Sequence, residues 1–311
     1  MTSHWEEFFA STSPPCDLEE NKKLLKDFTN YHLHFRRKIV LVTSGGTTVP
    51  LEHNTVRFVD NFSAGTRGSA SAEHFLEAGY AVIFMFRTKT LEPFVRHFMG
   101  QKFLDLLEIN RSSDSTMVNV KSENIDNILP VLTQYKAIQE RRQLLCLQFT
   151  SLPEYMWLLR AACESLSPYG PLAVMYLAAA VSDFYIPTHQ MPTHKMQSDS
   201  GPPTISLQLV PKMLEPLVSL WIPNAFVVSF KLETDESLLI SKARGALAKY
   251  KHKLVIANLL QTRKHRVVFV TPEDTQEVVL TEEEIQSGIE IESKIVLLLV
   301  AKHDKFIQEA V

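Results

Sequence analysis

The chain has 311 residues, of which 45% are hydrophobic, and its formal net charge at pH 7 is −3. This length fits one large or two small domains, and the charge gives no support for a nucleic-acid partner. No stretch reaches the ~18 consecutive apolar residues of a membrane span. The acidic N-terminus does not resemble a signal or transit peptide, and the three cysteines show no pairing pattern. We therefore expect a cytosolic protein with no membrane contact.

Apolar periodicity predicts alternating strands and helices. Residues 1–16 are expected to be disordered, and residues 17–311 to form a single nucleotide-binding domain. The predicted strands are 38–43, 80–86, 144–149, 172–178, 204–210, 225–230 and 253–257, with an edge hairpin at 266–271 and 276–280. The predicted helices are 17–35, 65–78, 151–166, 211–221, 235–249 and 290–306. Residues 88–140 are interpreted as an insertion, and the loop at 184–203 as a flap. This alternation indicates an α/β fold with a doubly wound, mostly parallel, Rossmann-like sheet.

Two glycine runs follow the first predicted strand. The first, TSGGT, covers residues 43–47, and the second, DNFSAGTRG, covers residues 60–68 and leads into the predicted helix at 65–78. Glycines such as Gly45 and Gly65 let a phosphate or ribose approach the backbone closely. The helix N-terminus offers free N–H groups and the positive end of its dipole. The two runs predict a nucleotide site, with two ordinary surface turns as the alternative.

Other predicted strand ends add small, acidic and basic side chains. Ala178, Ala179 and Ala180 end the fourth predicted strand, and they would either let a ligand lie against the backbone or pack a helix tightly on the sheet. Asp183 follows them and can accept hydrogen bonds from hydroxyl groups or assist a metal. Lys195 lies in the predicted flap, where an ammonium suits a polyphosphate or a developing oxyanion, although a loop lysine is usually solvated. The histidines of this loop lack the HExxH spacing, so no protein-held metal site is predicted.

Several common nucleotide motifs are missing from the chain. There is no GxGxxG, no Walker GxxxxGK[ST], and no tyrosine followed four residues later by lysine. The fold is therefore predicted to be dinucleotide-like without the expected hydride-transfer residues. An NAD(P)- or flavin-type oxidoreductase and a non-catalytic scaffold both stay open as alternatives.

Short motifs carry a resemblance to a known family. From about residue 37 onward the chain contains, in order, TSGGT, DNFSAGTRG, LAAAVSDFY, HKMQS, SFKLETD and ANLL. In this order and spacing they closely resemble the phosphopantothenate–cysteine ligases of the stand-alone eukaryotic form. The resemblance implies that ATP (or CTP), with Mg²⁺, activates 4′-phosphopantothenate as an acyl-nucleotide for ligation to cysteine in coenzyme A synthesis. ATP is the expected nucleotide, which would give an acyl-adenylate. Too few residues precede the first strand for the flavin-dependent decarboxylase domain of bacterial relatives, so we expect that activity to be absent.

The resemblance also implies roles for individual residues. The implied nucleotide site consists of Gly45, Ser63, Gly65, Gly68, Phe230 and Asn258. The implied phosphopantothenate site consists of Asn61, Ala179, Ala180 and Asp183. Lys195 and Asn61 are the implied catalytic residues, because the lysine would stabilise charge and the amide would donate to a substrate oxygen. The family forms homodimers, in which Arg57 is expected to reach the partner's site. From the residues alone, Arg57 is interpreted as solvated at a strand edge. Ala64 and Thr48 depart from the family pattern, which implies one lost hydrogen bond and weakens any phosphate role for residue 48.

Overall fold

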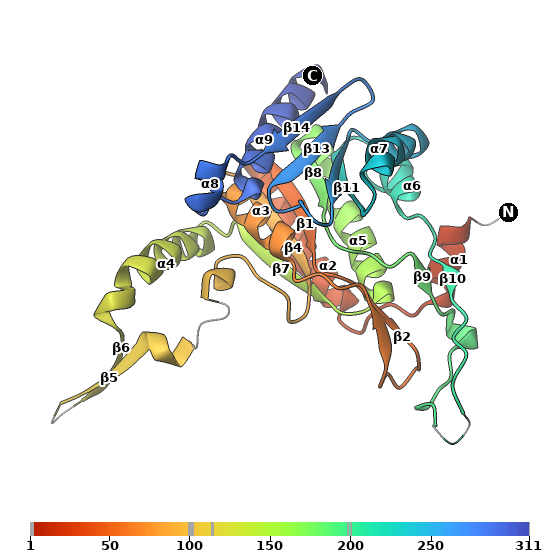
Figure 1. Ribbon diagram of the computed structural model, residues 1–311, viewed down its shortest axis with the longest axis horizontal. Helices are drawn as coiled ribbons and strands as arrows, with labels where there is room; N and C mark the ends of the chain where they lie inside the picture. Colours follow the sequence, from red (N-terminus) through yellow and green to blue (C-terminus); the bar gives the residue numbers. More distant parts are fainter. Residues whose placement is uncertain (1–2, 99–102, 113–114, 198, 200, 311) are drawn as a thin grey trace.

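The centre of the molecule is a twisted eight-stranded sheet with the strand order β14-β13-β12-β11-β8-β1-β4-β7 (Figure 1). The computed structural model describes residues 3–98, 103–112, 115–197, 199 and 201–310. The strands of this sheet are β1 (Ile39–Ser44), β4 (Ala81–Arg87), β7 (Leu144–Phe149), β8 (Ala173–Leu177), β11 (Phe226–Glu233), β12 (Leu254–Leu259), β13 (Arg266–Val270) and β14 (Thr275–Val279). The strands from β7 to β12 are all parallel, whereas β13 and β14 pair antiparallel at one edge. The predicted fold class, including its edge hairpin, is confirmed.

The order of the parallel strands reverses between β1 and β8. From β1, the next parallel strands along the chain, β4 and β7, extend to one side, and β8, β11 and β12 extend to the other. This is the strand order of dinucleotide-binding folds, in which ligands bind beyond the carboxyl ends of the strands at the point of reversal. The topology therefore points to the loops that follow β1 and β8.

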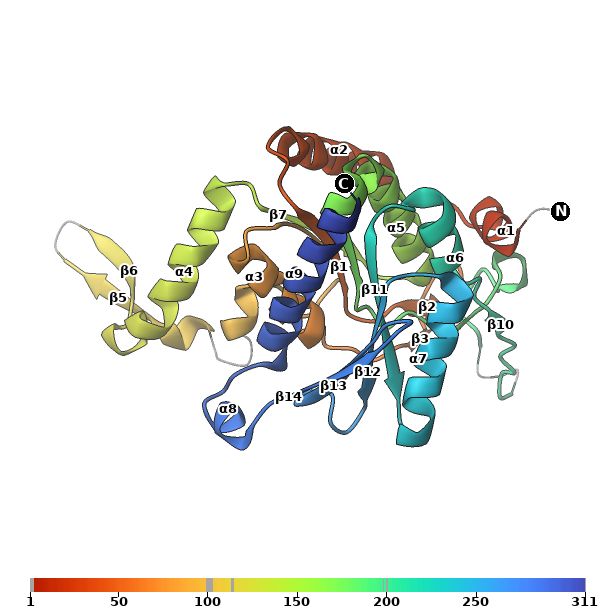
Figure 2. The same cartoon turned by 90° about the horizontal axis from the view of Figure 1, so that it is seen from above.

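Helices cover both faces of the sheet (Figure 2). One face is covered by α1 (His4–Ser11), α2 (Leu18–His34), α5 (Leu152–Leu166) and α7 (Glu236–Tyr250). The other is covered by α3 (Thr66–Glu77), α4 (Ile125–Glu140) and α9 (Ile291–Ala310). Side chains of β1 alternate between the two layers, with Ile39 and Leu41 on one side and Val40 and Val42 on the other, and all of them are fully buried. A central strand buried on both faces is continuously apolar.

The N-terminal segment differs from its prediction. Residues 1–16 were expected to be disordered, but His4–Ser11 forms helix α1, and only residues 1–2 of the segment lie outside the described part. Trp5, Phe8 and Phe9 recur at helical spacing and create one aromatic face. The Phe8 ring packs edge-on against Tyr185 at 5.4 Å between ring centroids, and Phe9 packs against Trp157 at 4.8 Å. Burial of these rings stabilises a segment that was expected to be disordered.

Residues 88–140 separate β4 from β7 and contain structure of their own. They include η1 (Val95–Phe98), η2 (Phe103–Leu106), the hairpin β5 (Leu107–Arg111)–β6 (Thr116–Val120), η3 (Ser122–Asn124) and α4. The hairpin projects away from the sheet (Figure 1). Residues 99–102 and 113–114 of this predicted insertion lie outside the described residues.

Short elements complete the fold. They are β2 (Thr48–Pro50) paired with β3 (Phe58–Asp60), β9 (Phe184–Tyr185) paired with β10 (Gln208–Leu209), η4 (Ser167–Leu172), η5 (Thr188–Gln190), α6 (Leu214–Pro216), η7 (Leu217–Trp221) and α8 (Glu282–Gln286). The strand predicted at 204–210 is wrong for most of its length, because only residues 208–209 pair and residues 201–209 are exposed. No helix within the described part of the chain is both long and apolar enough to span a bilayer.

Candidate active site at the strand-order reversal

The loops that follow β1 and β8 are joined by backbone hydrogen bonds at the reversal point. The Ala180 amide donates to the Gly45 carbonyl at 2.8 Å, and the Thr47 amide donates to the Ala180 carbonyl at 3.1 Å. The Ala179 amide donates to Thr43 Oγ1 at 3.1 Å. The structure thus brings together Gly45, Ala179 and Ala180, which were predicted from separate strand ends. Their side chains are absent or small, so this edge of the sheet presents mainly backbone.

The second glycine loop lies directly over the first. The backbone amide of Asn61 donates to the Thr47 carbonyl at 3.2 Å. The hydroxyl Oγ of Ser44 donates to the Gly65 carbonyl at 3.1 Å. A Cβ at Gly46 would lie 1.6 Å from the Asn61 carbonyl oxygen. Only glycine fits at residue 46, and this contact fixes Asn61 beside the end of β1.

Helix α3 begins at this loop. Its N-cap is Gly65, which has a φ of +83°, and its first turn contains no acidic side chain. The positive end of the helix dipole is therefore not neutralised by a carboxylate of its own first turn, and it remains available to an anion. Ser63 precedes the N-cap and is half-buried.

Gly68 has a packing role that the sequence did not reveal. Its absent side chain was interpreted as room for a ligand, yet a Cβ at Gly68 would lie 2.4 Å from both Cβ and Oγ of Ser44. The glycine therefore lets α3 pack closely on β1. A nucleotide contact at Gly68 stays a prediction.

Phe230 and Asn258 lie on the neighbouring strands β11 and β12. The Phe230 ring is half-buried and packs edge-on against Tyr176, with the ring centroids 5.0 Å apart. The buried Asn258 donates from Nδ2 to the Lys231 carbonyl at 3.0 Å. Asn258 therefore holds a defined position near the carboxyl end of β12, whereas Phe230 lies in the middle of β11, because this strand continues to Glu233.

Asp183 is paired with a lysine that the sequence analysis did not single out. Lys212 Nζ donates to Asp183 Oδ1 at 2.6 Å, and both side chains are well exposed. The Val210 amide donates to the Asp183 carbonyl at 2.9 Å, which holds the two segments together. The sequence around Lys212 does not indicate this pairing, because it shows only a basic residue after Pro211. The pairing forms because the chain that leaves the flap folds back beside Asp183.

Arg57 is held by a buried carboxylate and is not simply a solvated strand-edge residue. Its guanidinium Nη1 donates to Glu52 Oε1 at 2.9 Å, and the Glu52 side chain is fully buried. The backbone amides of Arg57 and Val56 donate to Glu52 Oε2 at 3.0 and 3.2 Å. Burial disfavours the charged carboxylate, but these bonds outweigh burial and hold the pKa of Glu52 below its ordinary value. Glu52 is therefore ionised at neutral pH.

The predicted flap docks on the turn that contains Glu52. The His53 amide donates to the Pro192 carbonyl at 2.9 Å, and the Asn54 amide donates to the Thr193 carbonyl at 3.0 Å. Lys195 follows these contacts, and its side chain is exposed. Among the described residues, its ammonium has no hydrogen-bond or ion-pair partner, so the structure does not join Lys195 to the other predicted site residues. Residues 198 and 200 of the predicted flap lie outside the described part.

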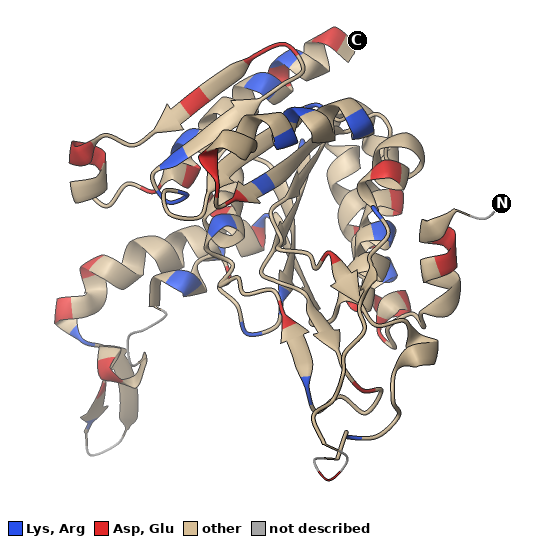
Figure 3. Ribbon diagram, turned by 45° about the vertical axis from the view of Figure 1, so that its right-hand side comes forward, with Lys and Arg blue, Asp and Glu red and all other residues tan. Residues whose placement is uncertain are grey.

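Two of the hollows in the described part of the molecule lie away from the strand-order reversal. One, of about 690 Å³, lies between α7 and α9 at the amino ends of β11 and β12, and its basic side chains include Lys251, Lys253 and Lys302. Lys251 is the C-cap of α7, where a cation complements the negative end of the helix dipole. Figure 3 marks the Lys and Arg positions of the ribbon in blue. The other, of about 940 Å³, lies between α1 and β10 and includes Lys212 on its wall. Neither hollow includes the glycine loops.

Known proteins resemble this chain in sequence and in fold. A family model described as the DNA/pantothenate metabolism flavoprotein C-terminal domain matches residues 35–124 and 159–297. The chain is 47% identical over 275 residues to a Homo sapiens protein named phosphopantothenate–cysteine ligase, covering 87% of this chain and 88% of that protein. It is 41% identical over 331 residues to the Saccharomyces cerevisiae phosphopantothenate–cysteine ligase CAB2, covering 98% of this chain and 87% of that protein.

A solved structure is also similar. It is a Cab2 mutant in complex with phosphopantothenate-cysteine, and it superposes with a TM-score of 0.89 at 42% identity, covering 98% of this chain and 99% of that chain. The resemblance seen in the sequence motifs is thereby confirmed, and the chain belongs to the phosphopantothenate–cysteine ligase family.

Proposed function

We propose that this chain catalyses the ATP-dependent ligation of 4′-phosphopantothenate to cysteine in coenzyme A biosynthesis. The products are phosphopantothenoylcysteine, AMP and pyrophosphate. The observation that carries the proposal is the meeting of both glycine loops with Ala179 and Ala180 at the strand-order reversal, in a chain of this ligase family.

The reaction has two steps. A carboxylate is a poor acyl donor, because its leaving group would be oxide. Attack of the carboxylate oxygen on the α-phosphorus of ATP forms an acyl-adenylate and breaks the bond to pyrophosphate. The cysteine amine then attacks the acyl carbon, AMP leaves, and the amine gives up a proton. Both steps develop negative charge on oxygen, which N–H donors and cations stabilise when they are already in position.

The site residues are assigned to two of the three substrates, the nucleotide and phosphopantothenate. The proposed nucleotide site consists of Gly45, Ser63, Gly65, Gly68, Phe230 and Asn258. Asn61, Ala179, Ala180 and Asp183 form the proposed phosphopantothenate site. Lys195 supplies positive charge from the flap during nucleotidyl transfer or aminolysis. The unneutralised N-terminus of α3 supports the nucleotide assignment, because it attracts phosphate.

The proposal also includes Mg²⁺, a homodimer and a cytosolic location. In the described part of the chain, no three His, Cys, Asp or Glu side chains gather as a protein-held metal requires. Mg²⁺ is therefore assigned mainly to the phosphates and water, which it usually retains as ligands. Arg57 is assigned to the site of the partner subunit.

The proposal is tested by pyrophosphate release. The purified protein is supplied with phosphopantothenate, cysteine and either ATP or CTP, and pyrophosphate and the nucleotide product are measured. Without cysteine, an acyl-adenylate should form on the enzyme and be detected by mass spectrometry. Formation of ADP and inorganic phosphate would mean an acyl phosphate intermediate and would refute the mechanism. Hydride transfer with no ligation would favour the oxidoreductase alternative.

A further inference from the structure

The buried carboxylate of Glu52 contacts two segments that the proposed reaction needs. It lies in the turn between β2 and β3, and it accepts hydrogen bonds from the Val56 amide and from both the amide and the guanidinium of Arg57. The Met196 amide, from the flap, also donates to Glu52 Oε1 at 3.4 Å. One carboxylate therefore joins Arg57 to a flap residue that is distant in sequence.

Arg57 contacts the same flap residue from the other side. Its Nη1 donates to the Met196 carbonyl at 3.2 Å as well as to Glu52. Both polar groups of the Met196 backbone are thus bound, the amide by Glu52 and the carbonyl by Arg57. Met196 directly follows Lys195, so these contacts restrict the backbone that carries the lysine.

The charge of Glu52 is essential to this arrangement. A fully buried carboxylate is strongly disfavoured unless it is paired and hydrogen-bonded. The donors around Glu52 meet that requirement, and three of them are backbone amides or a guanidinium from the turn itself. Without the carboxylate, Arg57 would lose its buried partner and the Met196 amide would lose its acceptor.

We propose that Glu52 is a positioning residue that fixes Arg57, which is assigned to the partner's site, and the Lys195 segment of the flap, which is assigned to its own subunit's site, as one unit. The inference rests on the proposed function, in which Arg57 and Lys195 act on the substrates. Glu52 itself is buried, so we assign it no contact with a substrate. Its effect passes through the two cations, whose separate segments it holds in a common geometry.

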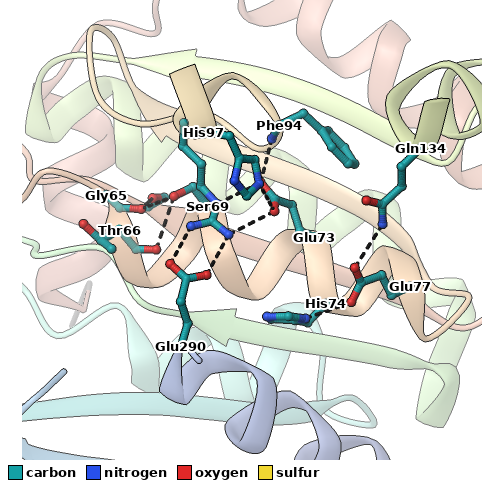
Figure 4. Close-up of polar contacts among 12 residues, drawn as sticks. Gly65, Thr66, Ser69, Glu73, His74, Glu77, Phe94, His97, Gln134 and Glu290 are labelled. Atoms are coloured by element: carbon teal, nitrogen blue, oxygen red, sulfur yellow. Dashed lines mark hydrogen bonds and ion pairs between the residues drawn. The ribbon is translucent and has the colours of Figure 1, made fainter. Parts of the chain in front are cut away.

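The test compares Glu52→Gln with a matched buried carboxylate, Glu73→Gln. Glu73 lies on α3, away from the flap, and accepts hydrogen bonds from Arg96, His97 and the Phe94 amide (Figure 4). Both substitutions remove a buried charge from an arginine network, so both lower stability. The readouts are kcat, KM for phosphopantothenate, thermal unfolding, and hydrogen exchange of a peptide that covers 188–197.

We expect Glu52→Gln to lower kcat at least tenfold and to speed exchange of the 188–197 peptide at least tenfold. Glu73→Gln should leave both within about twofold of wild type, although it also lowers thermal stability. Glu52→Asp keeps the charge and should retain more activity than Glu52→Gln. If Glu52→Gln does not fold, Glu52→Asp provides the same comparison, with smaller changes in the same direction.

Two results overturn the inference. One is unchanged flap exchange in both Glu52 variants, and the other is a kinetic loss in Glu73→Gln that equals the loss in Glu52→Gln. The exchange measurement needs neither substrate nor turnover. If the wild-type protein releases no pyrophosphate, the proposed function fails, and the exchange data still decide whether Glu52 holds the flap.

Discussion

Replacement of Gly68 by alanine tests whether this glycine serves packing or ligand approach. An alanine in a helix is ordinarily more stable than glycine by about 1 kcal/mol. At Gly68 the new Cβ would lie 2.4 Å from Cβ and Oγ of Ser44, on the central strand β1. Overpacking of this kind costs about 1–3 kcal/mol. We therefore expect Gly68→Ala to lower the free energy of unfolding by up to about 2 kcal/mol, which is the overpacking cost less the gain in helix propensity.

Gly245 provides the matched control. It lies in α7, where nothing would come within 4 Å of an added Cβ. In Gly245→Ala the higher helix propensity of alanine is not opposed by a steric clash, so the substitution should stabilise the protein by up to about 1 kcal/mol. The opposite signs at two helical glycines separate steric conflict from helix propensity.

A double-mutant cycle with Ser44→Gly completes the test. Ser44→Gly alone loses the hydrogen bond to the Gly65 carbonyl, which costs about 0.5–1.5 kcal/mol. It also removes Ser44 Cβ and Oγ, which would lie 2.4 Å from the alanine Cβ at residue 68, and leaves only the backbone Cα at 3.1 Å. The double variant should therefore be more stable than the two separate losses predict, by at least about 0.5 kcal/mol. Denaturant unfolding and nucleotide titration are measured on all variants. A Gly68→Ala protein that is fully stable and only binds nucleotide more weakly would refute the packing argument.

Four further predictions follow from the site and from one buried histidine. Lys195→Ala should lower turnover by on the order of 10²–10³ while nucleotide still binds, and unchanged turnover in a steady-state assay would identify a solvated loop lysine. Asn61→Asp places a negative charge near a carboxylate and phosphates, so it should weaken phosphopantothenate binding and activation more than thermal stability; normal substrate activation would make Asn61 only a turn residue. If Arg57 serves the partner subunit and Lys195 serves its own, mixing inactive Arg57→Ala and Lys195→Ala homodimers should restore about a quarter of wild-type activity after subunit exchange. Exchange without recovery refutes this division of the two residues between subunits. Burial lowers the pKa of His252 from 6.5 to about 4 and keeps the folded side chain neutral. The unfolded side chain takes up a proton first as the pH falls, so the free energy of unfolding should decrease from about pH 6.5 to pH 4. This group should contribute at most about 3 kcal/mol to the decrease. His252→Asn should remove that part of the pH dependence in denaturant titrations, and an unchanged pH profile would contradict it.

The parallel strands were predictable because their apolar runs are long and regular. The runs at 38–43 and 253–257 became β1 and β12 with shifts of one or two residues, since strands buried on both faces contain little else. Errors occurred where tertiary contacts override local composition. The N-terminal helix depends on Phe8 and Phe9 finding Tyr185 and Trp157, which lie far along the chain. The alternating pattern at 204–210 predicted a longer strand, but only Gln208 and Leu209 find partners, in the two-residue strand Phe184–Tyr185.

The glycine loops were predictable because their local sequence requires unusual backbone geometry. Gly45 and Gly65 both adopt a φ of +83°, which strongly favours glycine. Glu52 and Lys212 were not predictable, because each acts on a residue that only the folded chain brings near. A lone Glu in a turn and a lone Lys after a proline are ordinary surface residues by composition. Burial of one and pairing of the other are properties of the fold.

The split between the two glycine runs explains why no dinucleotide fingerprint was found. In that fingerprint a single short loop supplies one glycine for the turn after the first strand and another for close packing of the helix on that strand. Gly45 and Gly68 meet similar steric requirements here, but the β2–β3 ribbon separates them. The same ribbon carries Glu52 and Arg57 and receives the flap. The β2–β3 ribbon therefore has two effects. It separates the glycines that a motif search would expect in one loop, and it adds an arginine and a docking surface for the flap to the sheet edge.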